Sequence, residues 1–320
     1  MILDTFNLPQ AHRQTAPGKI ECFGLTDRGY IRDLNEDQFL VADLRKSLDV
    51  HHTSLGLSGH NHLTGDTHGQ LLLVADGLGG HASGERASTL AVDCLTRFAV
   101  NAMHWCARLD DCDDERVFAE WEEALQLCDE QVHAEGNARP ESHGMGTTLT
   151  LAYVAWPNAY ILHAGDSRCY LLRNGRLEQI TTDHTLAQKF IDAGMITPDQ
   201  AGQSRFSHVL WNAIGGTSDR VSTEAHKLAL EMGDVLLLCT DGLTNEVDDA
   251  TLAEMLSRPL PAADVCRELV TAAKEAGGND NITVVVARFV AKEQAGTSGG
   301  AGPLGEVSLY DTVDLDEFQP

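Results

Sequence analysis

Three short apolar runs along the chain share one feature, which is a carboxylate close to the point where each run ends. They are Leu71–Ala75 before Asp76-Gly77, Ala159–Ala164 before Gly165-Asp166, and Val235–Cys239 before Thr240-Asp241-Gly242. A short run that is apolar at every position is typical of a strand buried on both faces. Asp-Gly is also a common turn pair, so one such strand end would say little, but three indicate a shared role.

The same pattern of apolar and polar positions predicts the remaining elements. Further strands are expected at residues 20–26, 39–42, 147–155, 169–173, 221–230 and 282–289. Apolar residues at three- and four-residue steps predict helices at 85–107, 117–134, 184–194, 248–257 and 261–276. Pro157-Asn158 and Asn174-Gly175 are expected to form hairpin turns. Residues 195–220 mix Gly, Ser, Pro and Arg and predict an irregular surface excursion.

One domain is expected between two polar terminal segments. The chain has 320 residues, which is enough for one large domain or two small ones. Residues 1–17 are polar and end in Ala-Pro-Gly, so we expect a loose arm there. Residues 291–320 have few aromatic residues, many glycines and six acids, which is typical of a disordered acidic tail. We therefore assign residues 18–290 to the domain.

Residues 45–70 interrupt the pattern with histidine and glycine. Five of the 14 histidines in the chain lie here, together with four glycines. Such a tract could bind a metal, but no pair of these histidines has the i, i+4 spacing that places two ligands on one helix face. We therefore favour an exposed loop or a long hairpin between two strands.

Charge and cysteine content narrow the classes of function. The formal net charge of −25 argues against binding to nucleic acid and to anionic membrane surfaces. The eight cysteines are scattered and include no Cys-x-x-Cys pair, so reduced thiols in a cytoplasmic protein are expected and zinc is not. The start of the chain lacks the features of a signal peptide. No apolar run approaches the length of about 18 residues that spans a membrane.

Five aspartates stand at expected strand ends beside glycine, asparagine or serine: Asp37, Asp76, Asp166, Asp241 and Asp280. The ends of strands in a layered sheet fold can gather at one rim. Carboxylates held together there would repel one another, and a divalent cation removes that difficulty. Oxygen ligands select magnesium, manganese or calcium over zinc. Arg32, four residues before Glu36, is the candidate to grip phosphate oxygens beside such a site.

At this point the chain resembles a known family, the metal-dependent protein serine/threonine phosphatases of the 2C type (PPM) in their bacterial form. Six motifs carry the resemblance, in the order of the family and over roughly residues 20–290. They are Asp27-x-Gly29 with Arg32-x-x-Asn35-Glu36-Asp37, Asp76-Gly77-Leu78-Gly79-Gly80-His81, Gly144-Met145-Gly146-Thr147-Thr148, Gly165-Asp166-Ser167-Arg168, Asp241-Gly242-Leu243 and Asp280-Asn281-Ile282-Thr283. One such motif would be weak, but six in order are a specific signal.

The resemblance implies an α+β fold, a four-layer α-β-β-α sandwich of two antiparallel sheets flanked by helices. It also implies two core Mn²⁺ or Mg²⁺ ions in a cleft at one edge of the sandwich. By match to the family motifs, Asp76 bridges the two ions and the Gly77 carbonyl oxygen ligates one of them. Asp241 and Asp280 complete the shell of one ion.

The other implied roles concern the second ion, a third ion and the substrate. Glu36 and Asp37 serve the second ion, partly through water. Asp166, with Asp241, matches the position that holds a third, weaker metal in bacterial members. Arg32 binds the substrate phosphate. The implied reaction is in-line attack of a metal-bridging hydroxide on phosphoserine or phosphothreonine, without a phospho-enzyme.

One position departs from many members of the family. Eukaryotic members often carry a histidine directly after the Asp-Gly pair, proposed to protonate the leaving alkoxide, and here that residue is Leu78. We interpret His81 first as a structural residue of the turn and only second as an acid. Residues 184–220 match the variable segment beside the active site, which we call the flap. Its Arg205 and Arg220 could steer phosphopeptides or could be ordinary surface arginines.

Two alternatives to an active protein phosphatase are open at this point. A non-catalytic signalling module would have lost a core aspartate, and Asp37, Asp76, Asp241 and Asp280 are all present. A phosphatase for a small phosphorylated molecule would use the same site chemistry. The expected partners are phosphorylated proteins, including a serine/threonine kinase and its substrates, and we expect a monomer.

Overall fold

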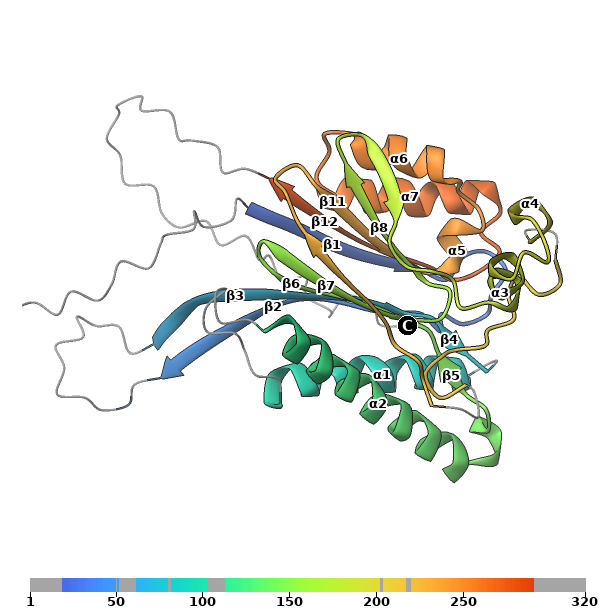
Figure 1. The fold of residues 1–320 in the computed structure, drawn as a ribbon, viewed down its shortest axis with the longest axis horizontal. Coiled ribbons are helices and arrows are strands. Elements are labelled where there is room, and N and C mark those ends of the chain that lie inside the picture. The colour runs from blue at the N-terminus through green and yellow to red at the C-terminus, as the bar shows by residue number, and fades with distance from the viewer. Residues whose placement is uncertain are drawn as a thin grey trace, which may run out of the picture.

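Two five-stranded antiparallel sheets lie face to face at the centre of the molecule (Figure 1). The computed structural model describes residues 19–49, 51, 62–79, 82–102, 113–201, 204–216 and 220–290. One sheet has the order β1-β12-β11-β8-β9 and the other β10-β7-β6-β3-β2. The first sheet consists of β1 (Lys19–Asp27), β12 (Ile282–Val290), β11 (Val235–Cys239), β8 (Arg168–Arg173) and β9 (Arg176–Gln179). The second consists of β10 (Glu224–Ala229), β7 (Asn158–Ala164), β6 (Leu149–Ala155), β3 (His62–Ala75) and β2 (Gln38–Asp49).

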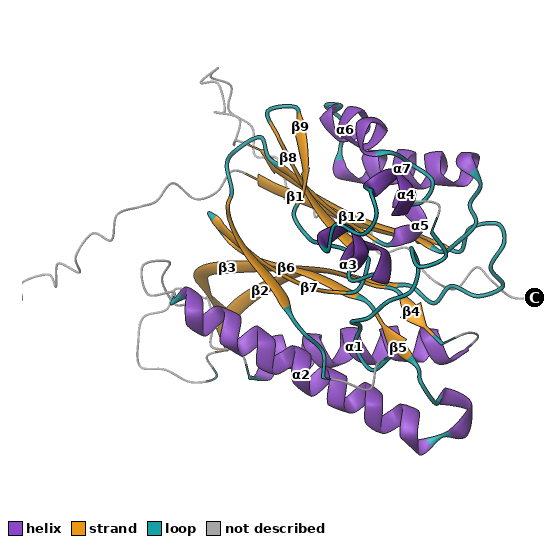
Figure 2. Cartoon of the chain, turned by 45° about the vertical axis from the view of Figure 1, so that its right-hand side comes forward, coloured by secondary structure: helices purple, strands orange, loops and turns teal. Residues whose placement is uncertain are grey.

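Helices cover the outer face of each sheet, as Figure 2 shows. Helices α1 (Ala82–Asn101) and α2 (Asp114–Ala138) lie on the sheet that contains β3. Helices α6 (Asp249–Ser257) and α7 (Ala262–Ala276) lie on the sheet that contains β11. The four layers are therefore helix, sheet, sheet and helix, as the resemblance implied.

Short elements complete the part of the chain that the structure describes. Strands β4 (Gly77–Leu78) and β5 (Gly146–Thr147) pair beside the end of β3. Helices α3 (Leu186–Asp192) and α4 (Pro198–Ala201) lie in the flap, and α5 (Asp241–Thr244) follows β11 directly. A 3-10 turn at Pro140–Ser142 joins α2 to β5.

The central strands are apolar at every position because each is covered on both faces. In β3, Leu71 and Leu73 pack against α1 and α2, whereas Leu72 and Val74 face the opposite sheet. Alternate residues of a strand point to opposite faces, so both sets are removed from water. This confirms the interpretation of the run that precedes Asp76.

Several predicted boundaries shift. Strand β3 begins at His62 and pairs with β2 as far as Asp49, so residues 45–49 and 62–70 belong to a long hairpin, the second form that we allowed for the 45–70 segment. The predicted helix at 184–194 is wrong at its start, because α3 begins at Leu186 with Thr185 as its N-cap. Strand β9 and helix α5 were not predicted.

Some expectations lie outside the described residues. These are the arm at 1–17, the tail at 291–320, residues 52–61 of the 45–70 segment, residues 103–107 of the first predicted helix, and His81. Within the described ranges, no helix combines the length and the apolar character that crossing a bilayer requires.

Candidate metal centre

The ends of strands from both sheets meet at one cleft of about 970 Å³. Asp76 follows β3, and Asp241 follows β11 in the opposite sheet. Both residues line the cleft, where the charge of Asp241 contributes to raising the pKa of Asp76. Seven of the eight predicted site residues line this cleft: Arg32, Glu36, Asp76, Gly77, Asp166, Asp241 and Asp280. Asp37, the eighth, is only 2% exposed and lies behind them.

The backbone of Asp76 is fixed by two threonines. Its N–H donates to Thr148 Oγ1 at 2.9 Å, and its carbonyl oxygen accepts from the Thr147 hydroxyl at 2.8 Å and from the Thr148 N–H at 2.9 Å. Gly77 follows, and a Cβ there would lie 2.3 Å from the carbonyl oxygen of Gly84 in the first turn of α1. Only glycine therefore allows α1 to approach the strand end this closely.

Asp37 is buried between two further threonines. Its Oδ2 accepts hydrogen bonds from the hydroxyls of Thr240 (2.9 Å) and Thr283 (2.7 Å). Its Oδ1 has no hydrogen-bond partner among the described residues. The Glu36 N–H donates to Asn281 Oδ1 at 2.8 Å, which ties the start of β2 to the start of β12.

The electrostatics of the cluster favour a bound cation. Burial, followed by the neighbouring carboxylates, raises the pKa of Asp37 to about 7 and the pKa of Asp166 to about 8. The same causes raise the pKa of Asp76, on which the carboxylates of Asp37, Asp241, Asp166 and Asp280 all act. Like charges held this close oppose ionisation, so the apo cluster resists full ionisation and a divalent cation would stabilise it.

The donor set fits hard divalent cations. Asp37 Oδ1 and Asp241 Oδ1 are both buried and lack a hydrogen-bond partner among the described residues. Unpaired buried carboxylate oxygens are costly unless a positive charge faces them. Oxygen ligands are those that Mg²⁺ and Mn²⁺ prefer. Asp37, Asp76, Asp166, Asp241 and Asp280 therefore suit a magnesium or manganese centre.

Arg32 lies at the mouth of the cleft. Its Nη2 donates to Asp280 Oδ2 at 2.6 Å, and its side chain is 53% exposed. The hydrogen bond to Asp280 is the first cause that raises the Arg32 pKa. Because a guanidinium has five N–H donors, the arginine can hold Asp280 and still present donors to an anion.

Other predicted residues fall at or outside the cleft. Leu78 lines it. The flap arginines do not: Arg205 packs over Phe206, and Arg220 forms an ion pair with Glu130 of α2 at 3.0 Å. Neither position supports the prediction that these arginines steer substrate.

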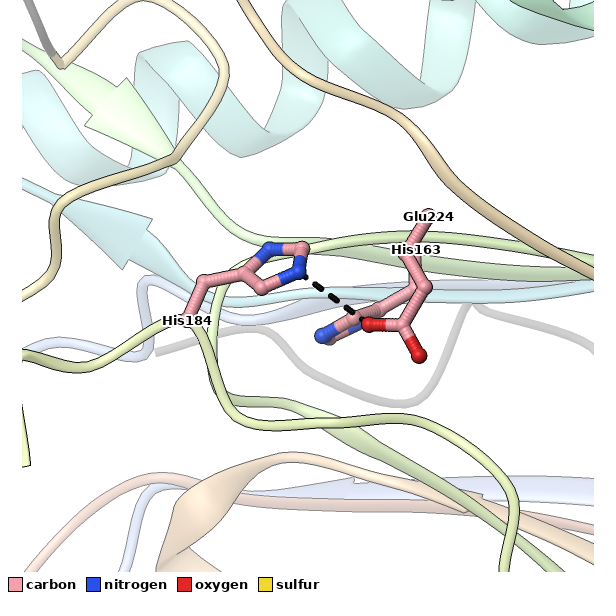
Figure 3. Close-up of side chains that lie close together, drawn as sticks. All are labelled: His163, His184 and Glu224. Carbon is pink, nitrogen blue, oxygen red and sulfur yellow. Dashed lines mark hydrogen bonds and ion pairs between the residues drawn. The ribbon is translucent and has the colours of Figure 1, made fainter. Parts of the chain in front are cut away.

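The supporting role of the threonines was not predicted from the sequence. Thr147, Thr148 and Thr283 stand inside the quoted motifs, and Thr240 directly precedes Asp241, which is the local signal that could have indicated this role. A second missed group is a buried cluster of His163, His184 and Glu224 next to the Asp166 loop (Figure 3).

Comparison with known proteins places this site in a family. Residues 60–283 match the model of the family described as Protein phosphatase 2C. The serine/threonine protein phosphatase PstP of Mycobacterium tuberculosis is 38% identical over 222 residues, which are 69% of this chain and 40% of that protein. The protein phosphatase PhpP of Streptococcus pneumoniae serotype 2 is 33% identical over 229 residues, or 71% of this chain and 88% of PhpP.

A solved structure extends the comparison to the fold and the metal. The catalytic domain of PstP in complex with two manganese ions superposes with a TM-score of 0.66 and 32% identity, covering 85% of this chain and 98% of that one. The chain spans 40% of the full PstP sequence and most of PhpP. The family match covers more than half of the chain and includes most of the cleft. This chain belongs to the protein phosphatase 2C family.

Proposed function

We propose that the protein is a metal-dependent phosphatase that hydrolyses phosphoserine and phosphothreonine in proteins. The observation that carries the proposal is the gathering of Asp76, Asp166, Asp241 and Asp280 with Arg32 around one cleft. This arrangement places a group of carboxylates that suits a divalent metal next to an arginine that suits a phosphate group. The relatives named as protein phosphatases, PstP and PhpP, support the same conclusion.

We assign the metal-binding roles as follows. Asp76 would be the ligand shared by the two core ions, and the carbonyl oxygen of Gly77 would be a ligand of one of them. Asp241 and Asp280 would hold one ion, while Glu36 and Asp37 would serve the other, partly through water. Asp166 with Asp241 would hold a third, weaker ion. When bound, these cations lower the pKa of coordinated water and neutralise charge on phosphoryl oxygens.

The residues of the chain supply position and charge. Thr147 and Thr148 hold the Asp76 backbone from both sides, so its carboxylate keeps one direction. Arg32 offers N–H donors to two phosphoryl oxygens in a fork that matches their spacing. Leu78, beside Asp76, has no proton to give, so the leaving alkoxide takes its proton from another group at the cleft.

A protein substrate and an opposing serine/threonine kinase are the physiological part of the proposal. They are supported by the names of the relatives rather than by a feature of the cleft. A monomeric state and a cytoplasmic location stay predictions, which size-exclusion chromatography with light scattering and cell fractionation would test.

The direct test is manganese-dependent hydrolysis of p-nitrophenyl phosphate and of a phosphothreonine peptide. We expect wild type to hydrolyse both and to lose activity with EDTA. Asp76→Asn should lose nearly all activity, because one bridging carboxylate oxygen and its charge are removed. Arg220→Gln is the matched control, since Arg220 lies outside the cleft and should keep wild-type rates. An inert wild type, or an active Asp76→Asn enzyme, would overturn the proposal.

A further inference from the structure

His163, His184 and Glu224 form a buried cluster beside the Asp166 loop, drawn in Figure 3. Each of the three residues offers one atom that could ligate a metal, and these three atoms lie within 4.8 Å of one another. The two histidines are 0% and 7% exposed. Such a trio could in principle bind a metal, so the partners of each nitrogen decide its role.

The ring nitrogens of both histidines already have protein partners. His163 Nε2 faces the carbonyl oxygens of Gly165 (3.0 Å) and Thr182 (3.1 Å), so this nitrogen carries the proton. His163 Nδ1 carries no proton in this tautomer and lies 2.9 Å from the Thr150 hydroxyl, whose one proton it shares with the Ser167 carbonyl oxygen at 3.1 Å. No lone pair of His163 is then available to a metal, and the cluster is a hydrogen-bonded structure instead.

The tautomer of His184 follows from its neighbours in the same way. Ser222 N–H donates to Asn212 Oδ1, so the Asn212 amide nitrogen faces the other way and donates to His184 Nδ1 at 2.8 Å. The Gly165 N–H also points at His184 Nδ1, at 3.2 Å. With two donors on Nδ1, the ring proton is on Nε2, which donates to Glu224 Oε2 at 3.1 Å. Glu224 therefore fixes the tautomer that lets Nδ1 accept.

Gly165, which directly precedes Asp166, depends on this arrangement. Its N–H donates to the His184 ring, and its carbonyl oxygen accepts from the His184 backbone N–H at 2.7 Å. Gly165 has a φ of +119°, and a Cβ there would lie 2.5 Å from Thr148 Cβ. A backbone in this conformation keeps its direction only where its neighbours hold it. The imidazole of His184 is one of those neighbours.

The same imidazole also connects the start of the flap to Trp211 and Asn212. Asn212, which follows the flap residues that line the cleft, contacts it, and the Trp211 N–H donates to the His184 carbonyl oxygen at 3.0 Å. The rings of Trp211 and His184 pack with centroids 5.0 Å apart. Flap residues between Thr185 and Leu210 line the cleft that holds the carboxylates. The His184 ring thus joins the start of the flap and Asn212 to the backbone beside Asp166.

We propose that His184 is a positioning residue, which acts through Gly165 on Asp166 and through Asn212 on the flap. This inference rests on the proposed function for its kinetic consequences. With His184 Nδ1 as the acceptor, the Gly165 backbone keeps the Asp166 side chain directed into the cleft. The start of the flap also stays bound to Asn212. Without that acceptor, cation affinity at Asp166 falls and substrate is held less well under the flap.

Two amide variants, each of which keeps the position of one ring nitrogen, separate the role of Nδ1 from simple packing. In His184→Asn the side-chain oxygen takes the place of Nδ1 and can still accept from Gly165 and Asn212. In His184→Gln the amide reaches toward Glu224 instead, and the Gly165 N–H loses its acceptor. Glutamine fills the cavity better than asparagine, so a packing role would favour His184→Gln, and the proposed role favours His184→Asn.

Direct metal binding and proteolysis provide readouts besides activity. We expect calorimetric titration with Mn²⁺ to show the weakest site of His184→Gln weakened about tenfold or more. Tryptic cleavage after Lys189 and Arg205, both in the flap, should be faster in this variant. At saturating Mn²⁺ its KM for a phosphothreonine peptide should stay raised while its kcat recovers. His184→Asn should keep most of the wild-type behaviour in each measurement.

His226→Gln is the control, because it changes the other histidine that is hydrogen-bonded to Glu224. His226 Nε2 lies 2.6 Å from Glu224 Oε1, and among the described residues no hydrogen bond joins His226 to Gly165 or to Asn212. This variant should bind Mn²⁺ as wild type does and should be cleaved by trypsin at the wild-type rate. The proposal is overturned if His226→Gln matches His184→Gln, if the two His184 variants behave alike, or if only their melting temperatures change. A wild type inert toward phosphate esters would sink the proposed function, while titration and proteolysis would still decide the role of His184.

Discussion

At the residue scale, the buried carboxylate of Asp37 depends on hydroxyl groups that come from the other sheet. Thr240 follows β11 and Thr283 lies in β12, and both donate to Asp37 Oδ2. The second carboxylate oxygen is left without a hydrogen-bond partner among the described residues, so it is free to take part in the proposed cation site. Outer partners of this kind orient metal ligands and contribute to affinity.

Removing one of these hydroxyls should weaken metal binding without removing a ligand. We expect Thr283→Val to raise the Mn²⁺ concentration for half-maximal activity by about tenfold to a hundredfold, because Asp37 Oδ2 loses a donor at 2.7 Å. Thr283→Ser keeps the hydroxyl and should stay close to wild type. Activity measured against Mn²⁺ concentration tests this, and equal curves for valine and serine would contradict it.

The site residues could be predicted from the sequence, whereas their supports could not. Asp76, Asp241 and the other motif aspartates stand at strand ends, which predicted that they gather at one rim, and the family resemblance implied their roles. The hydroxyls of Thr240 and Thr283 meet Asp37 across 203 and 246 residues of sequence. No local pattern carries information about contacts over such separations.

At the element scale, burial on two faces explains which strands were predictable. Strand β11 has the predicted bounds, because Leu237 packs on the helices while Leu236 and Leu238 face the other sheet. The outer part of the β2–β3 hairpin, as at the Leu44–Gly69 pair, is fixed by pairing between strands. Its sequence lacks the continuous apolar run, so the pattern alone placed the start of β3 too late.

Strand β7 carries a titratable group whose burial has a consequence for stability. Burial, then the neighbouring His184, lowers the pKa of His163 from 6.5 to about 4, against the opposite effect of Glu224 and Asp183. The unfolded chain therefore binds a proton at a higher pH than the folded protein does. The contribution of neutral His163 to folding stability is therefore complete above pH 6.5 and falls as the pH drops toward 4.

We expect this histidine to give wild type a steeper loss of stability in acid than His163→Asn. The lowered pKa of His163 corresponds to a loss of roughly 3 kcal/mol in the free energy of unfolding between pH 6.5 and pH 4. Urea unfolding in EDTA at several pH values measures the difference between the two proteins. The variant should be less stable at pH 7, and the gap should narrow toward pH 4. A gap that is constant with pH would show that His163 is not buried in its neutral form.

At the scale of the whole molecule, negative charge is concentrated where the two sheets meet. The chain has a net charge of −25, and Asp37, Asp76, Asp166 and Asp241 all have raised pKa values in the cleft. Carboxylates that follow strands of both sheets converge there, so a cation bound between them would also join the two halves of the sandwich. Cation binding and folding stability should therefore be linked.

Metal removal should lower the melting temperature of the whole domain. A cation at 100 times its dissociation constant stabilises the folded state by about 2.7 kcal/mol per site, which corresponds to roughly 5–10 °C for a domain of this size. Calorimetry with Mn²⁺ and with EDTA measures the shift, and NaCl at equal ionic strength separates binding from general screening. Asp76→Asn removes one carboxylate oxygen and the charge of the ligand that we propose the two ions share, so its melting temperature should respond to Mn²⁺ less than that of wild type. Equal shifts with NaCl and Mn²⁺ would mean that the carboxylates bind no specific cation, and that the cleft is held together by the threonine contacts and core packing alone.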